Sequence, residues 1–147
     1  MASDTSPSRV GPDTTQTEEE LRRLITMDDL VAAIVARSAL QEFSASPRIV
    51  HSAFFELTRK DVVPQLEELN FSQTGKFPFS HLLERVLFRL EMCGFLTLRN
   101  PDYDVYVVGS EPRQIFLEKI RRVFSHELTS QVDKLSEAFA KKIIAEL

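Results

Sequence analysis

The fold is decided by the stretch FSHLLERVLFRLEMCGFLTLR, residues 79–99. Ser80 is a residue type that caps helix N-termini, and Gly94 is the type that ends helices. Between them, apolar residues recur at helical spacing and give the helix one apolar face. That face comprises Leu82, Leu83, Val86, Leu87, Leu90 and Cys93. After Gly94 apolar and polar residues alternate, so the stretch predicts a helix that passes directly into a β-strand.

The strand continues into a predicted hairpin. Residues 95–99 and 105–108 are strand-like, and the turn-forming cluster 100–104 separates them. Upstream, the spacing of apolar residues predicts helices at 17–24, 27–41 and 47–59 and a short helix at 62–69. Thr26 and Asp29 resemble a capping box, and Ser46 followed by Pro47 is typical of a helix start.

A long apolar stripe marks the C-terminal part of the chain. It comprises Phe116, Ile120, Val123, Phe124, Leu128, Val132, Leu135, Phe139 and Ile143, in steps of three and four except at Val123–Phe124. Either one long helix or two helices bent near Ser125 and His126 would satisfy this pattern. A straight helix of this length exceeds what one small domain needs to cover. We therefore expect a dimerisation helix, with Leu128, Val132, Leu135 and Phe139 pairing with a second copy.

Composition limits the class of protein. The chain has 147 residues, enough for one domain, and a net charge of −4, which does not favour nucleic acid. The single cysteine, Cys93, is interpreted as a small buried apolar residue. The sequence has no signal-peptide pattern and no apolar run long enough for a membrane span, so we expect a cytoplasmic protein. Residues 1–17 are polar and are expected to be a disordered tail.

The order of predicted elements resembles the winged helix-turn-helix superfamily over about residues 47–108. The likeness is carried by the "L..L...G.L" pattern of Leu83, Leu87, Leu90, Gly94 and Leu96. It implies a mainly α fold with a small β-hairpin, of class α+β. A winged-helix domain with an N-terminal helical extension would span 18–110, and the C-terminal helix would span 111–147. The superfamily includes many DNA-binding proteins and also proteins that bind only protein.

The resemblance implies that the helix after Ser80 contacts DNA and that the hairpin touches the phosphate backbone. We expect duplex DNA to be bound by a dimeric transcriptional regulator. Arg85 and Arg89, which lie on this helix, would bind the DNA, and Lys76 and Arg99 would contact phosphates. Ser80 and His81 would support them from the helix start.

A protein-binding adaptor is the alternative. Glu84 and Glu91 share the outward face with the arginines and would repel phosphates. Phe88 and Met92 lie near the middle of that face, where they suit a protein partner better than a DNA groove.

No pattern predicts an enzyme. His51, His81 and His126 have no metal-ligand spacing with each other or with Cys93, so no metal or other cofactor is expected. The histidines are interpreted as surface or helix-capping residues. The sequence also has no Gly-rich phosphate loop and no Ser/His/Asp arrangement.

Overall fold

The computed structural model describes residues 25–146. The expected tail at 1–17 and the expected helix at 17–24 lie outside this range. The described chain is mostly helical and carries one small antiparallel sheet, which confirms the predicted α+β class.

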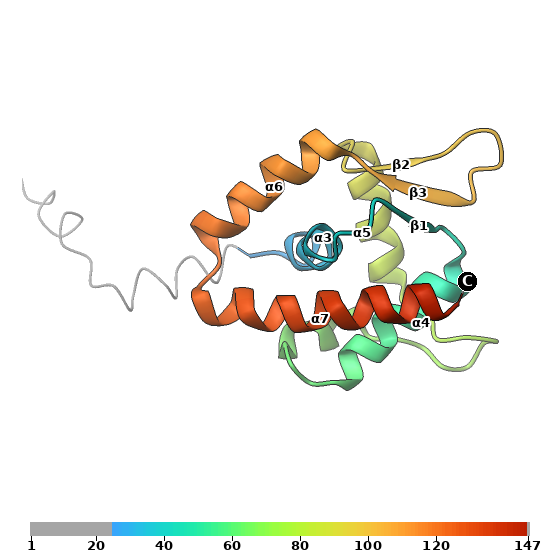
Figure 1. Cartoon of the computed structure of the whole chain (residues 1–147). Coiled ribbons are helices and arrows are strands. Elements are labelled where there is room, and N and C mark those ends of the chain that lie inside the picture. The colour runs from blue at the N-terminus through green and yellow to red at the C-terminus, as the bar shows by residue number, and fades with distance from the viewer. Residues whose placement is uncertain (1–24, 147) are drawn as a thin grey trace, which may run out of the picture.

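Helix α3, Met27–Arg37, lies at the centre of the fold. Figure 1 looks along it, with α6 above and α7 below. From residue 30 to residue 36 its sequence is apolar on every side, and residues 31–35 are completely buried. The predicted capping box is present, because Thr26 Oγ1 accepts a hydrogen bond from Asp29 N and Asp29 Oδ2 accepts one from Thr26 N, both at 3.1 Å. A helix that is apolar all round needs neighbours on all sides, and α5, α6 and α7 supply them.

α3 ends at Arg37, four residues before the predicted end at Gln41. Ala39 adopts a φ of 66°, which turns the chain into strand β1, Glu42–Ser44. This strand was not predicted from the sequence. It contains only one buried residue, Phe43, and its partner lies about sixty residues further along the chain, since Phe43 pairs with Tyr106 in β3.

The middle of the chain follows the prediction closely. Helix α4, Pro47–Arg59, starts with proline at its first position, although the Ser46 side chain makes no capping hydrogen bond. The predicted short helix is a 3₁₀ helix, η2, Pro64–Leu69. The loop after it is closed by two backbone hydrogen bonds between Ser72 and Phe79, of 2.8 and 3.0 Å.

Helix α5, His81–Met92, and the hairpin behind it are confirmed. Ser80 Oγ caps the helix by accepting from Leu83 N at 2.9 Å. Gly94 has a φ of 87°, a conformation that favours glycine, and it sends the chain into β2, Leu96–Leu98. β2 pairs with β3, Val105–Val108, and the sheet order is β1-β3-β2.

The C-terminal stripe forms two helices and not one. Helix α6, Ser110–Val123, stops at Phe124, and Ser125 caps helix α7, His126–Ala145, by accepting from Leu128 N at 3.0 Å. The bend lies where the second of the two alternatives placed it. It brings α7 back along α3 and α4.

The expected dimer surface on α7 is wrong. Leu128 is 7% exposed, and Val132, Leu135 and Phe139 are completely buried. α7 packs on α3 and α4, and the Phe139 ring lies 5.1 Å from that of Phe54 and 5.6 Å from that of Phe43. Because the bend folds the stripe onto its own domain, these four residues belong to the core and cannot receive a second copy.

Candidate functional site

Helix α5 leaves two large apolar side chains, Phe88 and Met92, in solvent on its outward side. Phe88 is 59% exposed and Met92 is 72% exposed. They lie one turn apart, so together they form a continuous apolar strip. Residue burial places the core face of α5 on the opposite side, at Leu83, Val86, Leu87 and Leu90. Removing a side chain such as Phe88 or Met92 from water is worth about 1.5–3 kcal/mol, so the strip is a costly surface to leave uncovered.

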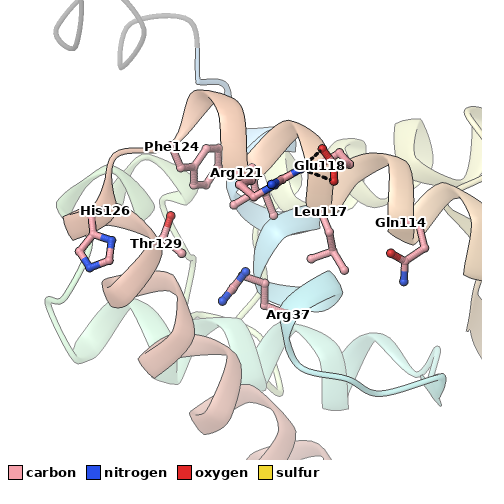
Figure 2. A pocket seen from close by; sticks show the side chains of 9 residues that line it. Arg37, Gln114, Leu117, Glu118, Arg121, Phe124, His126 and Thr129 are labelled. Atoms are coloured by element: carbon pink, nitrogen blue, oxygen red, sulfur yellow. Dashed lines mark hydrogen bonds and ion pairs between the residues drawn. The ribbon is translucent and has the colours of Figure 1, made fainter. Parts of the chain in front are cut away.

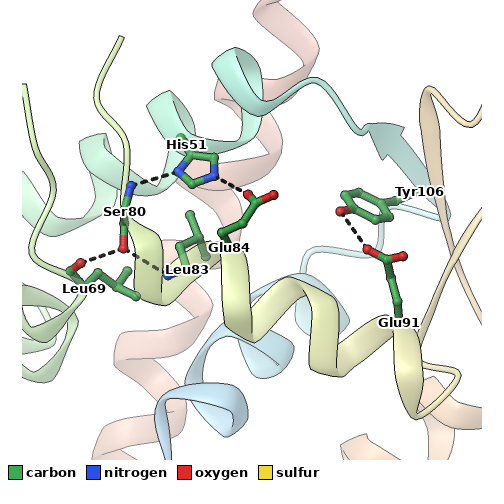
Figure 3. A network of polar contacts seen from close by, with 7 residues as sticks. All are labelled: His51, Leu69, Ser80, Leu83, Glu84, Glu91 and Tyr106. Atoms are coloured by element: carbon green, nitrogen blue, oxygen red, sulfur yellow. Dashed lines mark hydrogen bonds and ion pairs between the residues drawn. The ribbon is translucent and has the colours of Figure 1, made fainter. Parts of the chain in front are cut away.

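An acidic edge, Glu84 and Glu91, borders the strip on one side. Glu84 Oε1 lies 3.0 Å from His51 Nε2 of α4, and Glu91 Oε2 accepts a hydrogen bond of 3.2 Å from the hydroxyl of Tyr106 in β3. Figure 3 shows both carboxylates pointing to the same side of α5. Burial raises the pKa of Tyr106, and the charge of Glu91 adds to the shift. The acidic edge therefore faces α4 and the sheet.

A basic edge, Arg85 and Arg89, borders the strip on the other side. Arg89 makes a two-pronged ion pair with Asp28 of α3, with both nitrogen–oxygen distances at 2.7 Å. This hydrogen bonding raises the pKa of Arg89. Arg85 is exposed. The outward side of α5, called the α5 face below, is thus an apolar strip with acid on one side and base on the other.

His51 holds the beginning of α5 in place. It is completely buried, and its Nδ1 accepts a hydrogen bond of 3.1 Å from Ser80 N, so the proton of the neutral ring lies on Nε2 and is donated to Glu84. The ring stacks on Phe79 with 4.3 Å between centroids. Burial lowers the pKa of His51, and the hydrogen bond to Glu84 opposes the shift. His51 is therefore a buried residue that binds the backbone at the α5 cap and is not a surface histidine.

Of the six residues expected to contact DNA, the structure buries one, holds two in ion pairs and leaves three exposed. Ser80 is buried, and its hydroxyl donates to Leu69 O at 2.6 Å while it caps α5, so the expectation that it contacts a ligand is wrong (Figure 3). Arg99 Nη1 lies 2.6 Å from Glu42 Oε1 of β1, and Arg89 is held by Asp28. The remaining three, Lys76, His81 and Arg85, are exposed.

The turn of the hairpin adds little positive charge. Asp102 and Asp104 are exposed there, and Tyr103 between them is 58% exposed. Cys93 at the end of α5 is also exposed, which corrects the expectation that it is buried. It lies at the C-cap of the helix, outside the core face.

A pocket of about 520 Å³ adjoins the basic edge. Apolar side chains from α5, the start of β2 and α6 line it, among them Leu90, Phe95 and Phe116. Its rim carries two ion pairs, Arg89 with Asp28 and Lys119 with Asp29, the latter at 3.0 Å. Each cation at the rim therefore already has an anion beside it.

A second pocket, of about 470 Å³, lies at the corner between α3, α6 and α7 (Figure 2). Two arginines line it. Arg121 is paired with Glu118 at 2.6 Å, and Arg37 is paired with Asp133. The cations of this pocket are neutralised by their own neighbours, so it presents no unbalanced charge to a ligand.

Sequence reasoning found the α5 strip but missed what holds its borders. The partners of Arg89, Glu84 and Glu91 lie 61, 33 and 15 residues away in the chain, so no local pattern could indicate them.

Two further observations concern the described residues alone. Between residues 25 and 146, no helix combines the length and the apolar character that a membrane crossing requires. The same part of the chain brings no three His, Cys, Asp or Glu side chains together as metal ligands. Comparison with protein-family models, with curated proteins and with solved structures finds no match for this chain.

Proposed function

We propose that this chain is a winged-helix protein-interaction module that binds a protein partner through the α5 face. The order helix, strand, two helices and hairpin supports the winged-helix assignment, with α5 as the third full helix and β2–β3 as the wing. The observation that carries the function is the exposed strip of Phe88 and Met92 at the centre of that helix.

The borders of the strip favour protein over DNA. A reading helix in a major groove needs polar groups that reach base edges and cations that reach phosphates. Here the centre of the face is apolar, and Glu84 and Glu91 on its acidic edge would repel phosphates. An apolar centre with a polar rim is instead the usual anatomy of a protein interface.

Duplex DNA is the second candidate for the same face. It is supported by Lys76, His81 and Arg85, which are exposed at or before α5. A DNA complex resting on these residues would weaken steeply as salt is raised, whereas a complex resting on Phe88 and Met92 would change little.

Site-specific photo-crosslinking separates the two candidates. A photo-reactive phenylalanine analogue replaces Met92, and a matched control carries it at Ile144, an exposed apolar residue of α7. The variants are expressed in the organism from which the chain comes and are irradiated with ultraviolet light. We expect a covalent adduct with a protein from position 92 and none from position 144. An adduct to DNA at position 92, together with a salt-sensitive gel shift that is lost in Arg85→Ala, would overturn the proposal in favour of the regulator.

A further inference from the structure

We infer that the partner bound by the α5 face is a second copy of this chain, with the two α5 helices side by side and parallel about a two-fold axis. This inference rests on the proposed function, because it names the occupant of the same face. It replaces the dimer surface expected on α7, which the core occupies.

The charge pattern of the α5 face is complementary to itself in only one orientation. At roughly 100° per residue, Glu84 and Glu91 lie about 60–80° to one side of the strip, and Arg85 and Arg89 lie about 40–80° to the other. The contacts of these side chains agree with this division. The acidic edge reaches α4 and β3, and Arg89 on the basic edge reaches α3.

A two-fold axis parallel to the helices places the acidic edge of each copy against the basic edge of the other, at the same height along the helix. Glu84 then meets Arg85 of the second copy, one residue or about 1.5 Å away in height, and Glu91 meets Arg89. An antiparallel pair would place acidic edge against acidic edge and basic against basic. Opposite charges attract and like charges repel across such a seam, so the pattern selects the parallel pair.

The edge residues are accessible for these contacts. The Glu84 side chain is 56% exposed although it binds His51, and the Arg89 side chain is 49% exposed although it binds Asp28. A carboxylate accepts several hydrogen bonds and a guanidinium donates up to five, so the internal partners leave capacity for external ones. Phe88 and Met92 lie at the centre of the seam, where each copy covers the strip of the other.

The expected dimer is weak. The 12 residues of α5 span only ~18 Å, and two such helices bury less than the roughly 1,200 Å² that stable complexes require. Self-association should therefore be detected as a rise in the average molecular mass as the protein concentration increases.

Sedimentation equilibrium over a range of protein concentrations tests the inference. We expect the wild type to pass from monomer to dimer, Phe88→Asp to remain monomeric, and the control Ile144→Asp to behave as the wild type. Circular dichroism establishes that each variant is folded. A wild type that stays monomeric at every concentration, or a Phe88→Asp variant that still dimerises, overturns it.

A charge exchange tests the edges. Arg85→Glu and Glu84→Lys each place like charges across the seam, and each change acts twice because of the two-fold axis. We expect each variant alone to self-associate about tenfold more weakly. Mixing the two should restore association, because Glu at 85 then faces Lys at 84. Equal association of single variants and mixture contradicts the proposed seam.

A disulfide trap tests the orientation. With Cys93→Ser removing the native thiol, Met92→Cys places the new thiols across the axis in a parallel pair, within reach of each other. In an antiparallel pair that covers the same strip, residue 92 lies opposite residue 88. The two new thiols are then offset by roughly four residues, or ~6 Å, along the helix, so no disulfide forms. We expect a covalent dimer under mild oxidation, and a purely monomeric product counts against the parallel arrangement.

The two proposals fail differently. If the crosslink from position 92 reaches a different protein while the purified chain stays monomeric, the α5 face is a protein-binding site and the second copy is not its occupant. If position 92 yields no protein adduct and the chain stays monomeric, both proposals fall.

Discussion

Helices α5 and α7 both carry apolar residues at helical spacing, and the fold treats them in opposite ways. α7 has one apolar stripe, which is buried against α3, α4 and Phe43 of β1. α5 has a core face of its own and a second apolar pair, Phe88 and Met92, on the other side. The stripe on α7 is therefore what the domain needs for its own core, and the pair on α5 is surplus to that need. Apolar residues beyond a complete core face are the better indication of a partner.

The largest effect on stability is expected at Phe139, the residue of the α7 stripe that tests whether this stripe belongs to the core. Phe139→Ala removes a fully buried ring that contacts Phe43 and Phe54, and we expect it to lower the free energy of unfolding by about 3–5 kcal/mol. Urea denaturation followed by circular dichroism measures this loss. A loss below about 1 kcal/mol would show that α7 is not packed on α3 and α4 as described.

A smaller effect is expected at the start of α5. Ser80→Ala removes the cap of Leu83 N and leaves Leu69 O without its donor in a buried place, at a cost of about 1–2 kcal/mol. Ser46→Ala is the matched control, since Ser46 occupies an N-cap position without a side-chain capping bond. Equal losses in the two variants, by the same urea assay, would contradict the capping role of Ser80.

Acidic pH is expected to lower the stability of the fold through His51, which binds the backbone at the start of α5. Because burial lowers the pKa of His51 in the folded chain, the unfolded chain takes up the proton first. The free energy of unfolding therefore falls as pH drops below about 6.5, the usual histidine value. Glu84 opposes this effect and His81 adds to it. Urea denaturation from pH 7.5 to 5 should show the decline, and His51→Gln should have a flatter profile. Parallel profiles would rule His51 out as its source.

The smallest effect belongs to the surplus pair. Phe88→Ala should change the free energy of unfolding of the isolated chain by no more than about 0.5 kcal/mol, because the ring is 59% exposed. The same variant should lose the crosslinks and the self-association assigned to the α5 face. A large loss of stability in the monomer would mean that Phe88 serves the core, and the comparison with α7 would collapse.

Much of the fold could be predicted because its signals are local. The capping box at Thr26, the proline start of α4, and the Ser80 and Gly94 boundaries of α5 each depend on residues within a turn of one another. The strand β1 could not be predicted from the tripeptide Glu42–Ser44 itself. These residues form a strand because they pair with β3, which lies far along the chain.

The candidate site was predictable in its centre and not at its borders. The positions of Phe88 and Met92 follow from helical spacing alone. The burial of His51 and the pairing of Arg89 with Asp28 depend on how distant elements meet. The wrong dimer surface has the same cause. The spacing of the α7 stripe is identical for a helix that returns to its own core and for one that leaves it, and the bend at Phe124 decides between them.

The bend also sets the order of events during synthesis. α3 leaves the ribosome before α7, which packs against it, and the hydroxyl of Ser136 in α7 donates to the Ile34 carbonyl 102 residues upstream at 2.8 Å. At about 5–20 residues per second, this interval takes roughly 5–20 s. During that time the buried apolar residues of α3 lack the cover that α7 supplies. Chaperones that hold apolar segments have their best opportunity to bind this protein in that interval, and slow translation would lengthen it.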